Sequence, residues 1–202
     1  MLVLRSSPPS PFGRKVKIAA AELGLLDRID IRIADTNDPG DSLRRENPLG
    51  KIPTLILEDG TVLFDSRVIV EWLDAEAGGD RLLPVERGAR FAALRLQALA
   101  DGLADAALLI VYETRLRAET ERSPNWVAHQ QGKIDRTLEA LEAEVPPLDA
   151  PITVGTIALA CALGYLDLRH GGRWREAHPK LVAWLDAFAA RVPSFEKTRV
   201  VP

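Results

Sequence analysis

The chain has 202 residues, of which 47% are hydrophobic and 27% charged, and its formal net charge is −3. This composition is ordinary for a globular protein, and the length suits two small domains better than one compact domain. No basic run is long enough to attract nucleic acid or an anionic membrane surface. Neither is therefore expected as a partner, and the charges are expected to form a solvated surface.

The sequence carries no signal for export or for membrane insertion. Met1–Arg5 is too short for a signal peptide and is followed closely by Pro8 and Pro9. The longest apolar run, Ile152–Leu168, contains threonine, glycine and aspartate and is not expected to cross a bilayer. The single cysteine, Cys161, excludes an intramolecular disulfide. These observations predict a cytoplasmic location.

The first 77 residues alternate strand and helix signals. Ile29, Ile31 and Ile33 alternate with charged residues, which predicts a strand with one buried face. Asp59 and Gly60 predict a hairpin between the last two strands. A helical crossover early in the order and a hairpin late in it give a mixed sheet. The strands are expected at 2–5, 29–33, 54–57 and 62–64, and the helices at 12–23, 42–46 and 66–75.

The first of these helices has an amphipathic pattern. Its apolar positions recur with a helical period, and Gly24 is expected to end it as a C-cap. The polar face is expected to consist of Arg14, Lys15, Lys17 and Glu22.

After a break at Gly78, Gly79 and Pro84, the rest of the chain reads as helical. The break predicts a linker at 78–86 between a domain at 1–77 and a domain at 87–202. The longest helix is expected to bend near Gly102, and the helix that is apolar almost all round should be the centre of its domain. The helices are expected at 86–121, 124–144, 153–168 and 179–191.

Five motifs stand in a fixed order along nearly the whole chain. They are Ser-Pro-Phe-Gly-Arg-Lys-Val at 10–16, Asn-Pro-Leu-Gly-Lys-Ile-Pro-Thr-Leu at 47–55, Asp-Ser-Arg-Val-Ile at 65–69, Leu-Leu-Pro at 82–84, and His-Pro-Lys-Leu at 178–181 with the tail at 191–195. In this order and spacing they resemble the soluble glutathione transferases, and the chain looks like a bacterial serine-type member.

The resemblance implies a fold of class α/β plus all-α. A thioredoxin-like domain with a four-stranded mixed sheet, which binds glutathione, is followed by an all-helical bundle that binds the second substrate. It also implies a homodimer that acts in detoxification, with glutathione as co-substrate and no separate cofactor. One departure concerns the helix that begins after Thr153, where Thr156 replaces the family's usual aspartate and offers an oxygen without a charge. The weakened cap is worth about 1 kcal/mol, so folding should survive it.

Ser10 is the candidate catalytic residue that the resemblance implies. A free thiol has a pKa of about 8.5, so only about 3% of glutathione is a thiolate at pH 7. A hydroxyl hydrogen bond and the positive end of a helix both stabilise the thiolate, and Pro11 suits the first turn of that helix. Ser6 and Ser7 are alternatives that lie nearer the strand, and Ser10 can also serve simply as the helix cap.

The resemblance implies a set of glutathione-binding residues around two turns. A cis bond before Pro53 presents the backbone of Ile52 to the ligand, although propensity alone favours a trans bond. Asp65 meets the γ-glutamyl ammonium and Ser66 its carboxylate, whereas the isolated dipeptide reads only as a helix cap. Lys51 is a candidate for the glycyl carboxylate or, alternatively, a solvated side chain.

The long helix supplies the remaining candidates. The resemblance makes Asp101 a candidate for contact with glutathione in the partner subunit, although a solvated or interface acid is the favoured interpretation; Asp105 follows four residues later. For Tyr112, a packing role is favoured over a chemical one. The candidates for the pocket around the second substrate, chosen by position, are Phe12 (which also belongs to the glutathione set), Leu108, Tyr112 and Arg115.

Other chemistries find less support. The three histidines have no metal-ligand spacing, so no metal is expected. Cys161 is expected to be an inert core residue, and no cysteine stands in the Ser10 loop, which disfavours dithiol chemistry. The predicted function is a glutathione transferase that acts on an electrophilic small molecule or a peroxide. The alternatives are a non-catalytic protein that binds glutathione or an apolar ligand, and a structural partner module.

Overall fold

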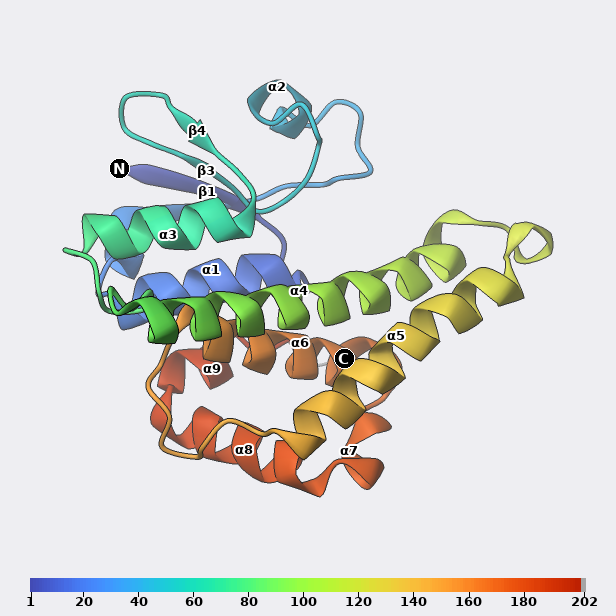
Figure 1. The fold of residues 1–202 in the computed structure, drawn as a ribbon. Helices are drawn as coiled ribbons and strands as arrows, with labels where there is room; N and C mark the ends of the chain where they lie inside the picture. Colours follow the sequence, from blue (N-terminus) through green and yellow to red (C-terminus); the bar gives the residue numbers. More distant parts are fainter. Residues whose placement is uncertain (201–202) are drawn as a thin grey trace.

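The computed structural model describes residues 1–200 and consists of a four-stranded mixed sheet followed by helices (Figure 1). The sheet has the order β2-β1-β3-β4, in which β1 is parallel to β2 and antiparallel to β3, and β3 is antiparallel to β4. The strands are β1 (Leu2–Ser6), β2 (Ile29–Ile33), β3 (Thr54–Ile56) and β4 (Val62–Leu63). The helices of this half are α1 (Pro11–Glu22), η1 (Leu26–Arg28), α2 (Leu43–Glu46) and α3 (Ser66–Glu76).

The centre of the sheet is apolar on the side that α1 and α3 cover. Leu4 on β1 is paired with Leu55 on β3, and both side chains are fully buried. The β3–β4 hairpin turns at Gly60, whose φ of 85° favours glycine, and Asp59 accepts a hydrogen bond from the Thr61 N–H at 2.8 Å. The predicted mixed sheet is confirmed, and each strand lies within one residue of its expected bounds.

The second half is all-helical and has α4 and α6 at its centre (Figure 1). The N-cap of α6 is the reciprocal pair Thr153 and Thr156, so the neutral substitute for aspartate does complete the cap. Gly155 lets α6 approach α4, since a Cβ there would lie 2.6 Å from the Ala93 carbonyl oxygen. The helices of this half are α4 (Arg87–Leu116), η2 (Glu119–Glu121), α5 (Pro124–Ala143), α6 (Val154–His170), α7 (Trp174–Ala177), α8 (Pro179–Arg191) and α9 (Pro193–Lys197).

Two expectations about these elements are wrong. α4, which is unbroken through Gly102, ends at Leu116 and not at the expected residue 121, because the buried Glu113 carboxylate accepts the Ser123 N–H at 3.1 Å and turns the chain back. β2 does not bury one face: Ile31 is 43% and Ile33 is 73% exposed, since β2 is an edge strand.

The polar face expected for α1 is also wrong at two positions. Arg14 and Lys15 are both buried, because α1 is covered on that side by helices of the second half. Figure 1 shows α1 between the sheet and α4. No helix among residues 1–200 is long and apolar enough to cross a membrane.

Candidate active site

A cleft of about 740 Å³ opens between the sheet half and helices α4 and α6. It is lined by the N-terminus of α1, the loop before β3, the N-terminus of α3, and one face each of α4 and α6. The cleft brings together every residue that the sequence nominated for the site: Ser10, Phe12, Lys51, Ile52, Pro53, Asp65, Ser66, Asp101, Leu108, Tyr112 and Arg115.

Ser10 lies where the loop after β1 becomes α1. It is the N-cap residue, its Oγ accepts the Gly13 N–H at 3.1 Å, and Pro11 occupies the first helical position. This bond uses a lone pair of the hydroxyl, so the O–H remains a donor. Ser10 therefore keeps a hydroxyl donor at the positive end of α1, where the residue lines the cleft.

The two competing serines differ in their access to the cleft. Ser7 lines it, and its carbonyl accepts the Ser10 N–H at 3.1 Å. Ser6 is 1% exposed and lies behind the loop, where a Cβ added to Gly13 would approach the Ser6 Oγ to 2.2 Å. Ser6 does not line the cleft, and only Ser7 stays an alternative to Ser10.

The loop before β3 is held from inside by a residue that the sequence did not nominate. Asn47 is 1% exposed and donates from Nδ2 to the Lys51 carbonyl and to Thr54 Oγ1, each at 3.0 Å. The Ile52–Pro53 peptide bond is cis, as the family resemblance implied and propensity did not. Asn47 stands in the quoted motif, but only the fold shows that its amide braces the turn.

The N-terminus of α3 forms the next part of the wall. Asp65 is exposed and caps the helix by accepting the Arg67 N–H at 2.9 Å, while Ser66 is 2% exposed. The peptide bond between Phe64 and Asp65 is also cis. The capping role expected for the isolated dipeptide is thus present, and it leaves one carboxylate oxygen of Asp65 free of that bond.

Asp101 is an internal ion-pair partner. It is 3% exposed, and its carboxylate accepts two hydrogen bonds from Lys15 Nζ, at 2.7 and 2.8 Å, and one from Arg67 Nε at 3.0 Å. The favoured interpretation as a solvated acid is therefore wrong. The pair with Asp101 raises the pKa of Arg67, whereas burial and the Asp101 charge raise the pKa of Asp105.

The far wall of the cleft is apolar with a cationic edge. It is made by Leu108, Tyr112 and Arg115 on α4 and by Tyr165 and Arg169 on α6. Burial raises the pKa of the Tyr165 phenol to about 12, and the charges of Arg169 and Arg115 act in the opposite direction.

Comparison with known proteins identifies the family. The glutathione S-transferase N-terminal domain model matches residues 9–76, and the C-terminal domain model matches residues 124–187. The "uncharacterized GST-like protein YibF" of Escherichia coli is 33% identical over 201 residues, which cover 96% of each chain. The chain belongs to the glutathione transferase family.

Two solved structures of a glutathione transferase family member from Pseudomonas fluorescens Pf-5 cover 100% of both chains at 42% identity. One, with bound glutathione, has a TM-score of 0.93, and the other, with bound S-(propanoic acid)-glutathione, has a TM-score of 0.89. The predicted family and the predicted fold, a mixed-sheet glutathione transferase domain followed by a helical one, are both confirmed.

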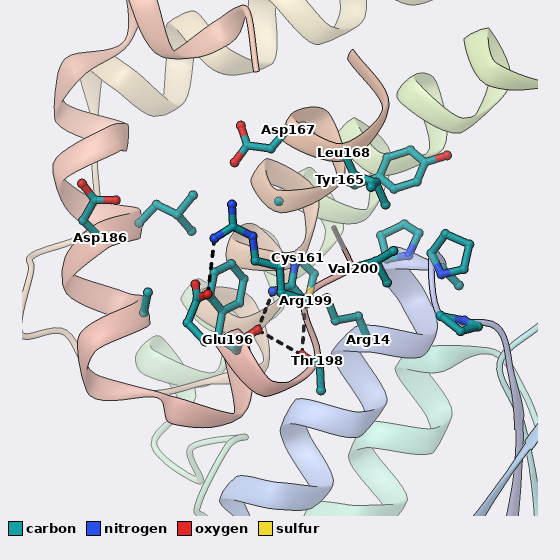
Figure 2. Close-up of a pocket in the computed structure, with 18 of the residues that line it drawn as sticks. Arg14, Cys161, Tyr165, Asp167, Leu168, Asp186, Glu196, Thr198, Arg199 and Val200 are labelled. Atoms are coloured by element: carbon teal, nitrogen blue, oxygen red, sulfur yellow. Dashed lines mark hydrogen bonds and ion pairs between the residues drawn. The ribbon is translucent and has the colours of Figure 1, made fainter. Parts of the chain in front are cut away.

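A smaller cavity of about 170 Å³ lies behind the Ser10 loop of this transferase family member (Figure 2). Arg14 crosses it, donates to the Phe195 carbonyl at 2.6 Å and to Thr198 Oγ1 at 3.2 Å, and stacks 3.9 Å above the Phe195 ring. Cys161 is one of the residues that line it, and burial raises the thiol pKa to about 11. The Arg14 side chain thus connects α1 to α9 and the residue after it. The expectation that Cys161 is a buried core residue is confirmed.

Proposed function

We propose that this chain is a serine-type glutathione transferase in which Ser10 activates the thiol of glutathione. The observation that carries the proposal is the position of Ser10 at the N-cap of α1, on the same cleft as the Ile52–Pro53 turn and the N-terminus of α3. The hydroxyl has accepted its capping bond from Gly13 and keeps its O–H for the sulfur. The alternative function is binding of glutathione, or of an apolar ligand, without catalysis.

Glutathione in this proposal lies along the sheet half of the cleft. The backbone of Ile52 pairs with the cysteinyl residue as a short strand would. Ser66 receives the γ-glutamyl carboxylate at the positive end of α3, and Asp65 receives the ammonium group. Lys51 meets the glycyl carboxylate. The glutathione bound to the Pseudomonas relative, at 42% identity over the whole chain, supports glutathione as the ligand.

The energy required of Ser10 is modest. Lowering the thiol pKa by about 2 units takes about 2.7 kcal/mol of selective stabilisation of the thiolate. A hydrogen bond to a charged acceptor contributes about 1.5–3 kcal/mol, and a helix N-terminus adds about 0.3–1 kcal/mol. The two contributions act on the same atom, since Ser10 is itself the cap of α1.

The activated sulfur then attacks an electrophilic carbon or a peroxide oxygen. On a peroxide, an S–O bond forms as the O–O bond breaks, the alkoxide leaves with the electron pair and is protonated to the alcohol, and a second glutathione thiol then displaces water from the sulfenic acid to give glutathione disulfide. On carbon, a C–S bond forms and a leaving group departs with its electron pair, or an activated double bond takes up a proton. The S-(propanoic acid)-glutathione bound to the relative is a thioether, the bond type that this step makes. The apolar side chains Leu108, Tyr112 and Phe12 contact the second substrate.

Asp101 has a different part in this proposal from the partner contact that the family resemblance implied. Both of its oxygens are engaged by Lys15 and Arg67, so it fixes the N-terminus of α3 against α4. A homodimer, a cytoplasmic location, a role in detoxification, and the domain division at 78–86 belong to the same proposal.

The test combines binding and turnover. Glutathione affinity is measured by calorimetry, and turnover is measured with 1-chloro-2,4-dinitrobenzene and with cumene hydroperoxide. Ser10→Ala should lower kcat/KM by about 10- to 100-fold with glutathione binding kept, because one charge-assisted hydrogen bond is lost. Ser7→Ala is the matched control. Unchanged turnover in Ser10→Ala would refute the catalytic assignment, and binding without any turnover in the wild type would favour the alternative.

A further inference from the structure

The charged side chains that line the cleft differ between its two ends. On the sheet half and near the middle of α4, the acids Asp35, Asp65, Asp101 and Asp105 are mixed with the bases Lys51 and Arg67. At the far end, the charged side chains that line the cleft are both arginines. These are Arg115, at the end of α4, and Arg169, at the end of α6.

The change in charge along the cleft follows one face of α4. Residues spaced by three or four positions lie on the same side of a helix. The face begins with carboxylates, continues with apolar side chains and ends with a guanidinium. Its members that line the cleft are Asp101, Asp105, Leu108, Tyr112 and Arg115.

The position of Ser10 along this face follows from a fixed contact. α1 and α4 run in opposite directions (Figure 1), and the Lys15–Asp101 pair holds them together. Ser10 is five residues from Lys15, or about 7.5 Å along α1, and Arg115 is fourteen residues from Asp101, or about 21 Å along α4. Arg115 therefore lies beyond the level of Ser10, with Tyr112 between them. This distance leaves room for a small electrophile between the sulfur and the guanidinium.

The second arginine approaches the same place from another helix. Arg169 is four residues from Tyr165 on α6, so the two share a face. The charges of both Arg169 and Arg115 act on the Tyr165 phenol. Among residues 1–200, Arg115 and Arg169 take part in none of the ion pairs, in contrast to Arg67 and Arg175, which are paired with carboxylates. Two unneutralised cations thus converge beside an apolar wall.

A position near a helix C-terminus accounts for either arginine alone. Cations are favourable in the last turn of a helix, and both residues lie in one. That role does not require the two to meet at a cleft. If it were their only role, substitution of either arginine would lower the stability of the protein and leave its preference among ligands unchanged.

We propose that the second substrate is an apolar electrophile that carries a carboxylate, which Arg115 and Arg169 bind. The proposal rests on the proposed function and names the substrate class for the same site. With a halogenated aromatic carboxylate, the sulfur forms a C–S bond at the carbon that bears the halogen. The halide leaves with the electron pair of the broken bond, and the carboxylate is unchanged. The apolar ring lies against Leu108 and Tyr112.

The test compares two glutathione conjugates that differ only in charge. These are S-(4-carboxy-2,6-dinitrophenyl)glutathione and its 4-carboxamide counterpart, titrated into the full chain by calorimetry. The wild type should bind the carboxylate about tenfold more tightly, the worth of one charge-assisted contact. The ratio should fall to about one in the Arg115→Gln, Arg169→Gln double variant. It should survive in Arg115→Lys and in the control Arg95→Gln, an exposed arginine on α4 outside the cleft.

Two further readouts decide the outcome. The carboxylate preference should shrink with added salt, since it is electrostatic. Equal binding of the two conjugates by the wild type, or a preference that persists in the double variant, would overturn the proposal. The test measures binding, so its outcome does not depend on catalysis. If the wild type prefers the carboxylate conjugate but Ser10→Ala leaves turnover unchanged, only the catalytic assignment of Ser10 is refuted. Failure to bind glutathione itself would end the proposed function and this inference together.

Discussion

Lys15 on α1 and Asp101 on α4 form a bidentate pair, with Nζ 2.7 and 2.8 Å from the two carboxylate oxygens, and both side chains are buried. The pair joins the helix that Ser10 caps to the helix that forms the far wall of the cleft. Arg67 adds a third contact from α3, so the helices α1, α3 and α4 meet at one carboxylate.

Breaking this pair should be costly because it leaves a buried charge without its partner. We expect Asp101→Ala to lower the free energy of unfolding by about 3–5 kcal/mol, as for other buried pairs. Arg67→Ala should cost less than about 1 kcal/mol, because the Arg67 side chain is 51% exposed. Urea unfolding of the two variants checks the contrast. Equal losses of unfolding free energy in the two variants would show that the buried Lys15 ammonium does not depend on the Asp101 carboxylate.

Two glycines in neighbouring helices should respond to alanine in opposite ways. A Cβ at Gly155 would lie 2.6 Å from the Ala93 carbonyl, so Gly155→Ala must push α6 away from α4 and should cost about 1–3 kcal/mol. Gly102, in the middle of α4, has open space around its Cβ position, and Gly102→Ala should stabilise by about 0.5–1 kcal/mol. Thermal unfolding of both variants measures the difference. A stabilised Gly155→Ala would contradict the close approach of the helices.

Cys161 should make stability fall at alkaline pH. Burial raises its thiol pKa to about 11, from 9.0 for the free group. The folded chain therefore keeps a proton that the unfolded chain loses, so the contribution is present below pH 9 and disappears as pH rises towards 11. Across that window the wild type should lose on the order of 2 kcal/mol more than Cys161→Ala. Parallel pH profiles of the two proteins would refute the burial of this thiol.

Ser66 should control glutathione affinity without affecting sulfur activation. It lies at the N-terminus of α3, away from the Ser10 loop in the chain. Ser66→Ala should weaken glutathione binding by about tenfold, the loss of one hydrogen bond to a charged group, and leave kcat at saturating glutathione nearly unchanged. The matched control is Ser123→Ala, which removes the cap of α5 outside the cleft. A loss of affinity of the same size in the control would show that the effect is not local.

The sequence predicted the framework of the cleft because its motifs are local. The Ser10 cap, the turn before β3 and the α3 N-terminus are each set by a few adjacent residues, and the family resemblance supplied the cis bond at Pro53 that propensity disfavoured. α7 and α9 were not predicted as helices, since four or five residues are too few to show a helical period.

Long-range partners explain most of the remaining errors. Lys15 looked like a surface residue on an amphipathic helix, and its burial depends on Asp101, which is 86 residues away in the sequence. The end of α4 depends on Glu113 holding Ser123, a contact that no helical pattern reveals. The exposed face of β2 follows from its place at the edge of the sheet, which strand alternation does not report.

The most direct test of the central claim is the pKa of the glutathione thiol when it is bound, read from the ultraviolet absorbance of the thiolate as pH is raised. With wild-type protein, the pKa should lie about 2 units below the free value of about 8.5. In Ser10→Ala the pKa should rise by at least about 1 unit, because one hydrogen bond to the sulfur is lost. In Ser7→Ala it should stay low. A bound thiol that titrates near its free value in the wild type, or at the same lowered value in Ser10→Ala, would contradict the account.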